Sequence, residues 1–457
     1  MLEPDEEIPD DRCGFVLQPA QETDDISKRM IRRQVERTQL ATCIRKTWSQ
    51  GRCIWHADVK AKPVDDLLRS RTSGKECLDG AILNETEWPT NVSFNDCSLI
   101  RSQWQDAEVV EAYFKDSVLD AADFSNANLL GTDFSDADLA VVNFCDAELP
   151  HARFSGVYAE DAKFLGANLL RTDFKNAMLT GATLADVNLL DADFTDSELH
   201  GARFTGSNLT DADLSKSNLR KANLARTRLH NAVFDETDVR GADFQEAALY
   251  QVFLENTRID NSTEFGDKTA YRMRNSEIQL RPEDFGDPNS LQAAAWVNRR
   301  LKSLHEENAM TEETRKFHIR KEEAERALDA YEENWGRWSV KTLMRYLTNH
   351  GESVKHVLGW WVAVIGLSAF LFPWVGGIKD NTGNVYALSS LSELSSLAGW
   401  NEWGLNLYFS IITFSTIGYG DLSPASPLAR ALVGFESIAG ALLLALLVFV
   451  LGRRVAR

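Results

Sequence analysis

Hydrophobic and polar positions in the middle of the chain repeat every five residues. From Phe94 to Ile259 nearly every fifth position is apolar, and the one small residue in that register is Ala159. A small residue stands two positions before most of them, as Ala127 does before Leu129. A period of five fits neither the 3.6-residue turn of a helix nor the two-residue alternation of a strand. The chain must therefore turn a corner every five residues.

This segment resembles the pentapeptide-repeat family, in which a small residue is followed by Asp or Asn, by Leu or Phe, and by two polar residues. Ala127-Asn128-Leu129 and Ala137-Asp138-Leu139 carry the resemblance. It implies a right-handed quadrilateral β-helix with four pentapeptides in each coil and ladders of Phe and Leu along its axis. Nearly all of these residues are then core, and no chemistry follows from them.

Acidic residues gather at outward positions of the repeat. A repeat solenoid exposes extended faces that are suited to partners or to self-association. A protein partner on the β-helix faces is therefore one reading, and a simply solvated acidic face is the other. The residues concerned are Asp136, Asp146, Glu148, Asp191, Asp193 and Asp196.

Two apolar segments near the C-terminal end suit a membrane. His356 to Ile378 contains no charged residue, and 431–452 is interrupted only by Glu436. Each segment is long enough to cross a bilayer as a helix. Basic residues lie before the first segment and after the second, as at Lys355 and Arg453. The positive-inside tendency then predicts a multi-pass protein of the cell membrane with both termini cytoplasmic.

Between these segments, an apolar stretch leads into Thr416-Ile417-Gly418-Tyr419-Gly420 and Asp421. The order resembles the potassium-channel signature, a short pore helix followed by a selectivity filter. Glycines permit backbone conformations in which successive carbonyls point at one axis and replace the water around a dehydrated K⁺. The resemblance implies that the Thr416 hydroxyl adds the innermost ligands, that Ile417 and Tyr419 pack outward, and that Asp421 lies at the outer mouth. One chain carries one such loop, so the resemblance implies a homotetramer.

Two residues of the second apolar segment are candidates for further roles. Gly440 lies midway along it and is a candidate gating hinge, with close helix packing as the alternative. Glu436 is an ionisable group inside the membrane. It either helps the filter or attracts cations, or it is a hydrogen-bonded structural carboxylate behind the filter. No Arg-rich segment of the voltage-sensing kind is present.

The segment before the pore reads as helices. Val297, Leu301 and Leu304 share one helical face, and Thr311 with two following glutamates predicts a helix start. Residues 335–347 mix Trp, Leu, Lys and Arg in a pattern typical of a helix on an anionic membrane surface. Such a helix would pass motion from the β-helix to the first membrane span.

The six cysteines are too few for a disulfide scaffold, and a reducing, cytoplasmic setting fits them better. The acidic start of the chain has no apolar core of the kind a secretory signal needs. Cys13, Cys43, Cys53 and His56 together offer four zinc ligands, with ordinary buried thiols as the alternative.

These observations predict a mixed fold. It has an N-terminal cytoplasmic region (1–77), a pentapeptide-repeat β-helix (78–262), an α-helical connector (263–350) and a two-helix transmembrane pore domain (351–457). The net charge of −19 argues against nucleic acid as a partner. The function expected is a homotetrameric potassium channel in a lipid bilayer, with no enzymatic step and a regulatory or assembly role for the β-helix. The alternative is a membrane-tethered scaffold that binds partners through the β-helix.

Overall fold

The computed structural model divides the chain into two compact units. The first comprises Met1–Ile278 with Arg299–Met310, and the second comprises Gln279–Asn298 with Thr311–Arg457. The structure describes residues 13, 45–46, 48–49, 52–71, 76–266, 288–387 and 397–455. Cys43 lies outside these residues.

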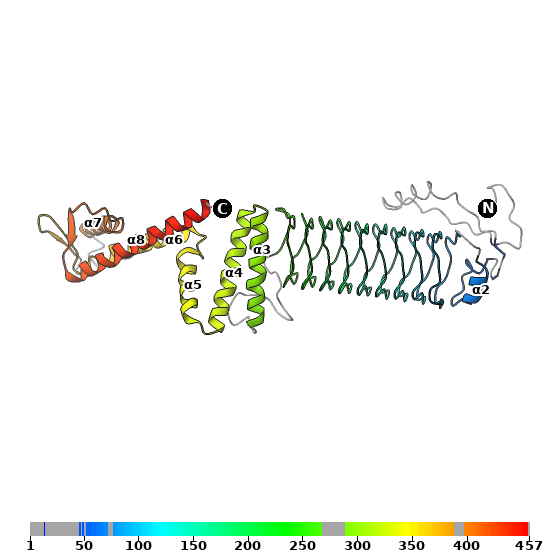
Figure 1. The fold of residues 1–457 in the computed structure, drawn as a ribbon. Helices are drawn as coiled ribbons and strands as arrows, with labels where there is room; N and C mark the ends of the chain where they lie inside the picture. Colours follow the sequence, from blue (N-terminus) through cyan, green and yellow to red (C-terminus); the bar gives the residue numbers. More distant parts are fainter. Residues whose placement is uncertain are drawn as a thin grey trace, which may run out of the picture. The chain divides into compact units, whose positions relative to one another are not determined.

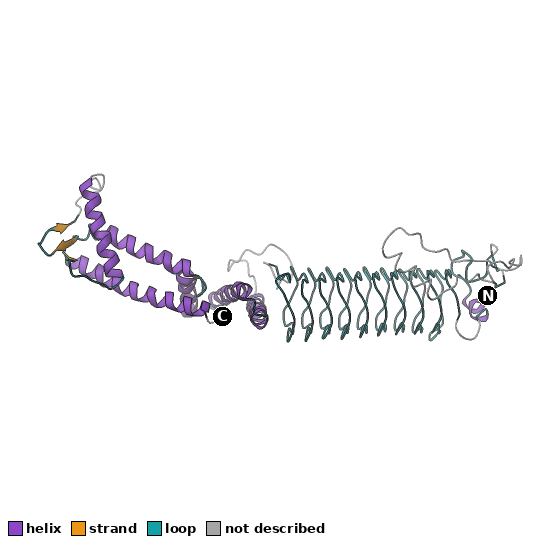
Figure 2. Ribbon diagram, turned by 90° about the horizontal axis from the view of Figure 1, so that it is seen from above, coloured by secondary structure: helices purple, strands orange, loops and turns teal. Residues whose placement is uncertain are grey.

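The first unit is built around a β-helix with a coil of twenty residues (Figures 1 and 2). Parallel bridges join residues twenty apart, as from Tyr113 to Asp133 and from Asp133 to Arg153. Twenty residues are four pentapeptides, so each coil has four sides. The quadrilateral β-helix predicted from the repeat is confirmed.

Aromatic ladders fill the core of the β-helix. Phe114, Phe134, Phe154 and Phe174 are fully buried, and successive rings stack with centroids 5.1, 5.0 and 5.0 Å apart. Small residues such as Ala127 are buried beside them. Each ring contacts the rings twenty residues before and after it, in the neighbouring coils. Because a coil has four sides and each side adds one residue to such a ladder, a large residue is needed every five positions.

The corners of the coils explain much of the acidity. Every fifth residue has a left-handed backbone, and Asp136, Asp146, Asp191 and Asp196 occupy such positions with φ of 58°, 57°, 56° and 59°. Asp, Asn and Gly tolerate this conformation better than other residues do. The turn geometry is therefore sufficient reason for these four aspartates. Glu148 and Asp193 lie instead at bridge positions between coils.

The β-helix extends slightly beyond the strict five-residue register. Its bridges begin at Cys77 and end at Glu264. Trp88 and Phe94 are both buried although they are six residues apart, and the same spacing separates Ile259 from Phe265. One extra residue at each place shifts the register, and the coils continue on both sides of it, close to the predicted bounds of 78 and 262.

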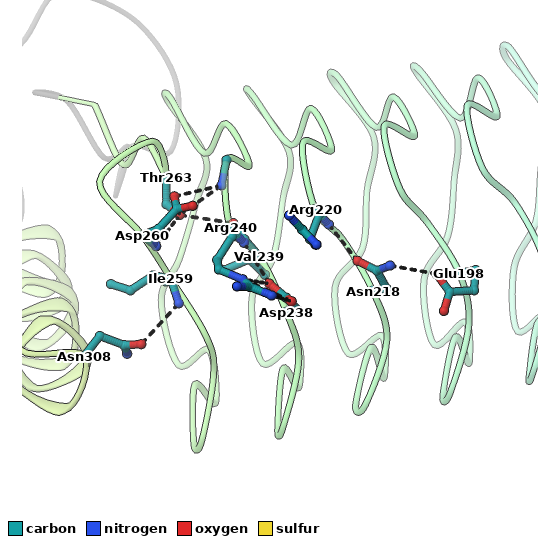
Figure 3. Close-up of polar contacts among 11 residues, drawn as sticks. Glu198, Asn218, Arg220, Asp238, Val239, Arg240, Ile259, Asp260, Thr263 and Asn308 are labelled. Atoms are coloured by element: carbon teal, nitrogen blue, oxygen red, sulfur yellow. Dashed lines mark hydrogen bonds and ion pairs between the residues drawn. The ribbon is translucent and has the colours of Figure 1, made fainter.

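Both ends of the β-helix are covered. At the N-terminal end Trp55 is fully buried and stacks on Trp88 at 6.3 Å, and the short helix α2 (Val64–Arg69) follows. At the other end lies the second half of α3 (Pro288–Glu307) with the turn after it. There Asn308 accepts a hydrogen bond from the Ile259 amide at 3.3 Å (Figure 3). These caps shield core and unpaired strand edges that would otherwise be exposed.

The connector of the second unit contains α4 (Thr311–Tyr331) and α5 (Trp335–Thr348). The predicted helix start at Thr311 is confirmed. Lys341 lies 2.9 Å from Asp329, and Arg345 lies 3.2 Å from Glu323. Two basic residues of α5 thus pair with α4 rather than pointing away from it, while its apolar side chains Trp335, Val340, Leu343 and Tyr346 are exposed. The membrane-surface helix stays a prediction.

The C-terminal part holds three helices and a small sheet. They are α6 (Val354–Leu371), α7 (Leu397–Phe414) and α8 (Pro427–Val455), with α6 and α8 side by side (Figure 2). Ser426 caps α8, because its hydroxyl accepts the Ala429 amide proton at 3.0 Å, and Pro427 fits the first helical position. The antiparallel strands are β1 (Ile378–Asp380), β2 (Val385–Tyr386) and β3 (Leu422–Pro424), in the order β2-β1-β3.

Candidate functional site

The segment after α7 has an alternating backbone conformation. Thr416, Gly418 and Gly420 have φ of 56°, 49° and 77°, whereas Ile417 and Tyr419 between them do not have positive φ. A positive φ is strained for a β-branched residue such as Thr416, and strain of this kind clusters at functional sites. Alternation of left-handed and other residues turns successive peptide groups toward one side, which is the geometry needed for a row of carbonyl ligands.

Both ends of this loop are anchored. At its start, the amides of Ile417 and Gly418 reach the carbonyl of Ile412 at 3.1 and 3.4 Å, closing the end of α7. At its end, β3 pairs with β1, so Leu422 lies opposite Asp380. In addition, the Tyr408 hydroxyl on α7 donates to Asp421 at 3.0 Å. The loop is therefore held against the helix before it and the sheet after it.

Side chains of the loop are exposed to solvent in the single chain. Ile417 is 55% exposed and Tyr419 is 69% exposed. A Cβ added at Gly418 or Gly420 would meet no atom within 4 Å. These two glycines are therefore needed here for their backbone conformation, since nothing in the chain crowds them.

Two helices among the described residues are long and apolar enough to cross a membrane. They are Val354–Leu371, which is α6, and Pro427–Arg454 within α8. The loop and α7 lie between them in the sequence. This order of span, short helix, loop and span matches the arrangement predicted for the pore.

Comparison with protein families finds matches to two separate parts of the chain. A model described as an ion channel matches residues 382–457. A model of a pentapeptide repeat region matches 89–164, and one of pentapeptide repeats matches 152–189, 172–211 and 207–245. This chain is a pentapeptide-repeat protein fused to an ion channel domain. Together with the two apolar helices, the match places this channel protein in a membrane.

Solved structures similar to the channel protein are pentapeptide-repeat proteins. HetL, from the cyanobacterium Nostoc sp. strain PCC 7120, is 25% identical over 41% of this chain and 86% of its own, with a TM-score of 0.27. Full-length QnrB1, a plasmid-mediated fluoroquinolone resistance protein, is 19% identical over 41% of this chain and 93% of its own, with a TM-score of 0.21. These low TM-scores carry no argument about function. A search of curated proteins found no match.

Glu436 lies behind the pore helix. It is fully buried on α8, and the Ser410 hydroxyl on α7 contacts its Oε1. The same hydroxyl lies 2.9 Å from the carbonyl of Ile365 on α6. Ser410 lies six residues before Thr416 in the sequence. Through Ser410, Glu436 on α8 is linked to both α7 and α6. This position favours the structural carboxylate over a residue that faces ions.

Gly440 packs directly against the end of the pore helix. A Cβ at this position would lie 2.4 Å from the carbonyl oxygen of Phe414. Because α8 is one continuous helix from Pro427 to Val455, the glycine is explained by the close approach without a bend. The hinge stays a hypothesis.

A charged cluster at the end of α8 was missed by the sequence analysis. Arg453 donates to His318 Nε2 on α4 at 3.0 Å and to the carbonyl of His350 at 3.2 Å, and it lies 3.5 Å from Glu352. His350 in turn donates to Glu323 at 2.7 Å. Burial and the nearby Arg453 guanidinium lower the pKa of His318 to about 4. These contacts tie the connector to the second membrane span.

The predicted zinc ligands are brought together in part. Cys13, Cys53 and His56 are buried, and their ligand atoms lie within 4.8 Å of one another. This cluster lies in the first unit, at the N-terminal end of the β-helix, and belongs to no part of the channel domain.

Proposed function

We propose that this protein is a potassium-selective channel in which four copies of the chain surround one pore. The observation that carries the proposal is the backbone of the Thr416–Gly420 loop, where φ is positive at every second residue. Such a loop directs several carbonyl oxygens to one side, where they replace the hydration shell of K⁺. The Thr416 hydroxyl is the innermost ligand, and K⁺ is the permeant ion.

The need for four copies follows from the geometry of ion coordination. One loop supplies one side of the ion, and K⁺ filters are built from rings of backbone carbonyls. The exposure of Ile417 and Tyr419 supports the same proposal, because apolar and aromatic side chains beside a filter require cover from a neighbouring subunit. In the assembly these side chains brace the ring of carbonyls.

The proposed topology places the filter near the outer surface. Lys355 before α6 and Arg453 and Arg454 at the end of α8 favour the cytoplasm for both ends of the channel domain. Asp421 then lies at the outer mouth, where its charge raises the local concentration of cations. Transport by this route involves no enzymatic step.

For the β-helix we propose a regulatory or assembly role. The contacts of Arg453 with His318 and with the carbonyl of His350 join the connector directly to the end of α8. A change in α4 or in the turn before α6 would therefore shift the end of α8.

A second candidate function is a membrane-tethered scaffold that binds a protein through the acidic faces of the β-helix. Glu148 and Asp193 support it, because they add acidic side chains at bridge positions as well as at the corners of the coils. A tether has no need of a strained loop at Thr416. Ion flux therefore separates the two functions.

The test is potassium flux into liposomes that contain the purified full-length protein. We expect uptake of K⁺ well above that of Na⁺, and loss of this preference in Gly418→Ala, where a side chain would be strained at φ 49°. Gly404→Ala is the matched control, because its Cβ would meet no atom within 4 Å. Absence of cation flux in a correctly oriented, intact preparation would favour the scaffold instead.

A further inference from the structure

Three metal-ligating side chains meet at the N-terminal end of the β-helix. Cys13 Sγ lies 3.4 Å from His56 Nδ1, and Cys53 Sγ lies 3.3 Å from the same nitrogen. All three side chains are buried. Cys13 is forty residues from Cys53 along the chain, so this convergence is produced by the fold.

The tautomer of His56 supports a metal between the two sulfurs. His56 Nε2 lies 3.0 Å from the carbonyl oxygen of Asp79. A carbonyl oxygen only accepts, so Nε2 carries the proton, and the Nδ1 lone pair of the neutral ring faces both sulfurs. The lone pair of Nδ1 can accept a well-directed hydrogen bond from only one of the two thiols. A metal ion bound to Nδ1 can bind both sulfur atoms at the same time.

The distances also match those of a zinc site. With Zn–S near 2.3 Å and Zn–N near 2.0 Å in a tetrahedron, sulfur and nitrogen ligands lie about 3.6 Å apart. The two S···N distances of 3.4 and 3.3 Å are within a few tenths of an ångström of that value. The Asp79 carbonyl provides the outer hydrogen bond that metal-bound histidines usually make.

Backbone groups of all three ligand residues make hydrogen bonds. The amide of Cys13 donates a hydrogen bond to the carbonyl oxygen of Arg45 at 2.9 Å. The Arg52 side chain donates to the Cys13 carbonyl at 3.1 Å. Cys53 and His56 belong to one tight turn, in which the His56 amide donates to the Cys53 carbonyl at 3.0 Å. That turn carries Trp55, the residue that covers the first coil.

We propose that Cys13, Cys53 and His56 bind a structural zinc ion that fastens the N-terminal cap onto the β-helix. Two thiolates and an imidazole are a ligand set that suits Zn²⁺. Binding displaces the two thiol protons, so the site binds more tightly as the pH rises. Full burial of the ligands fits a structural ion rather than a catalytic one. The zinc joins the Cys13 segment to the turn that carries Trp55.

The first test is the metal content of the full-length protein purified without chelators. We expect about one zinc per chain, as a single structural site requires. Cys53→Ser should lose most of this zinc. Cys145→Ser is the matched control, because Cys145 is partly exposed on a coil and is not a member of the cluster, and it should keep the full amount. Equal zinc in wild type and Cys53→Ser would overturn the proposal.

Cobalt provides a second readout that does not depend on any variant. After zinc is removed from the wild-type protein, added Co²⁺ should give the visible bands of a tetrahedral ion and an ultraviolet absorption from thiolate to cobalt. Zinc should then abolish both. A wild-type protein that holds no zinc as purified and shows neither cobalt band would overturn the proposal even if Cys53→Ser fails to fold. Since the channel domain contributes no ligand, neither result depends on the proposed ion flux.

Discussion

The carbonyl oxygen of Phe414 faces Gly440 so closely that a Cβ at position 440 would lie 2.4 Å from it. Phe414 is the last residue of the pore helix, and Thr416 begins the strained loop two residues later. The close approach of α8 to the end of α7, next to the Thr416–Gly420 loop, is therefore possible because position 440 has no side chain.

We expect Gly440→Ala to displace the end of the pore helix and to reduce ion selectivity as well as flux. A Cβ cannot approach a backbone carbonyl to 2.4 Å, so the helices must separate. Gly434→Ala on the same helix is the control, because its Cβ would meet no atom within 4 Å. The measurement is the K⁺ to Na⁺ flux ratio of both variants. An unchanged ratio in Gly440→Ala would show that this contact does not position the filter.

The ion pair between Arg453 and Glu352 should fasten the end of α8 to the turn that precedes α6. Glu352 is buried and lies 3.5 Å from Arg453. Replacing either residue with Gln leaves the other charge without this partner. A double-mutant cycle of R453Q and E352Q should give a coupling energy of about 1–3 kcal/mol in the free energy of unfolding. Additive effects of the two substitutions would mean that the pair is not a working contact.

His318 should make stability depend on pH between about 6.5 and 4, because burial and Arg453 lower its pKa to about 4. In this range the unfolded chain binds a proton at His318 and the folded chain does not. Folding is therefore favoured most above pH 6.5 and loses stability as the pH falls toward 4. Thermal unfolding at several pH values should show a shallower decline in His318→Gln than in the wild type. Parallel curves for the two proteins would exclude this role.

The stacked rings of the β-helix should dominate its stability. Phe134 is fully buried between Phe114 and Phe154, with centroids 5.1 and 5.0 Å away. Phe134→Ala should lower the free energy of unfolding of the β-helix by about 3–5 kcal/mol. Phe253 is 56% exposed, so Phe253→Ala should change it by no more than about 0.5 kcal/mol. Denaturant unfolding compares them, and similar losses in both would contradict the ladder.

Local features of this protein could be predicted from its sequence. The five-residue period predicted the corners because each of the four sides of a coil must bury one large residue. Extra residues after Trp88 and after Ile259 break the strict period, so the period alone does not mark the two ends of the β-helix. The Thr416–Gly420 loop could be singled out from the sequence because its glycines serve backbone conformation, which is a property of the residues themselves.

Contacts between distant segments could not be predicted in the same way. Arg453 was noticed only as a basic residue after a membrane span, because nothing in its neighbourhood points to His318, 135 residues earlier. The grouping of Cys13 with Cys53 was predicted from residue type alone, whereas the geometry of their approach depends on how the cap folds over the first coil. The packing of Gly440 on Phe414 depends on the crossing of two helices. Each of these relationships exists only in the folded chain.

The most direct test of the potassium channel is the reversal potential of purified full-length protein in a planar bilayer, with K⁺ on one side and Na⁺ on the other. Selective carbonyl ligands at Thr416–Gly420 predict a current that reverses far from zero, close to the limit set by K⁺ alone, with Gly418→Ala moving the reversal toward zero. A wild-type current that reverses at zero would contradict potassium selectivity, and the filter would have to be reinterpreted as an unselective loop.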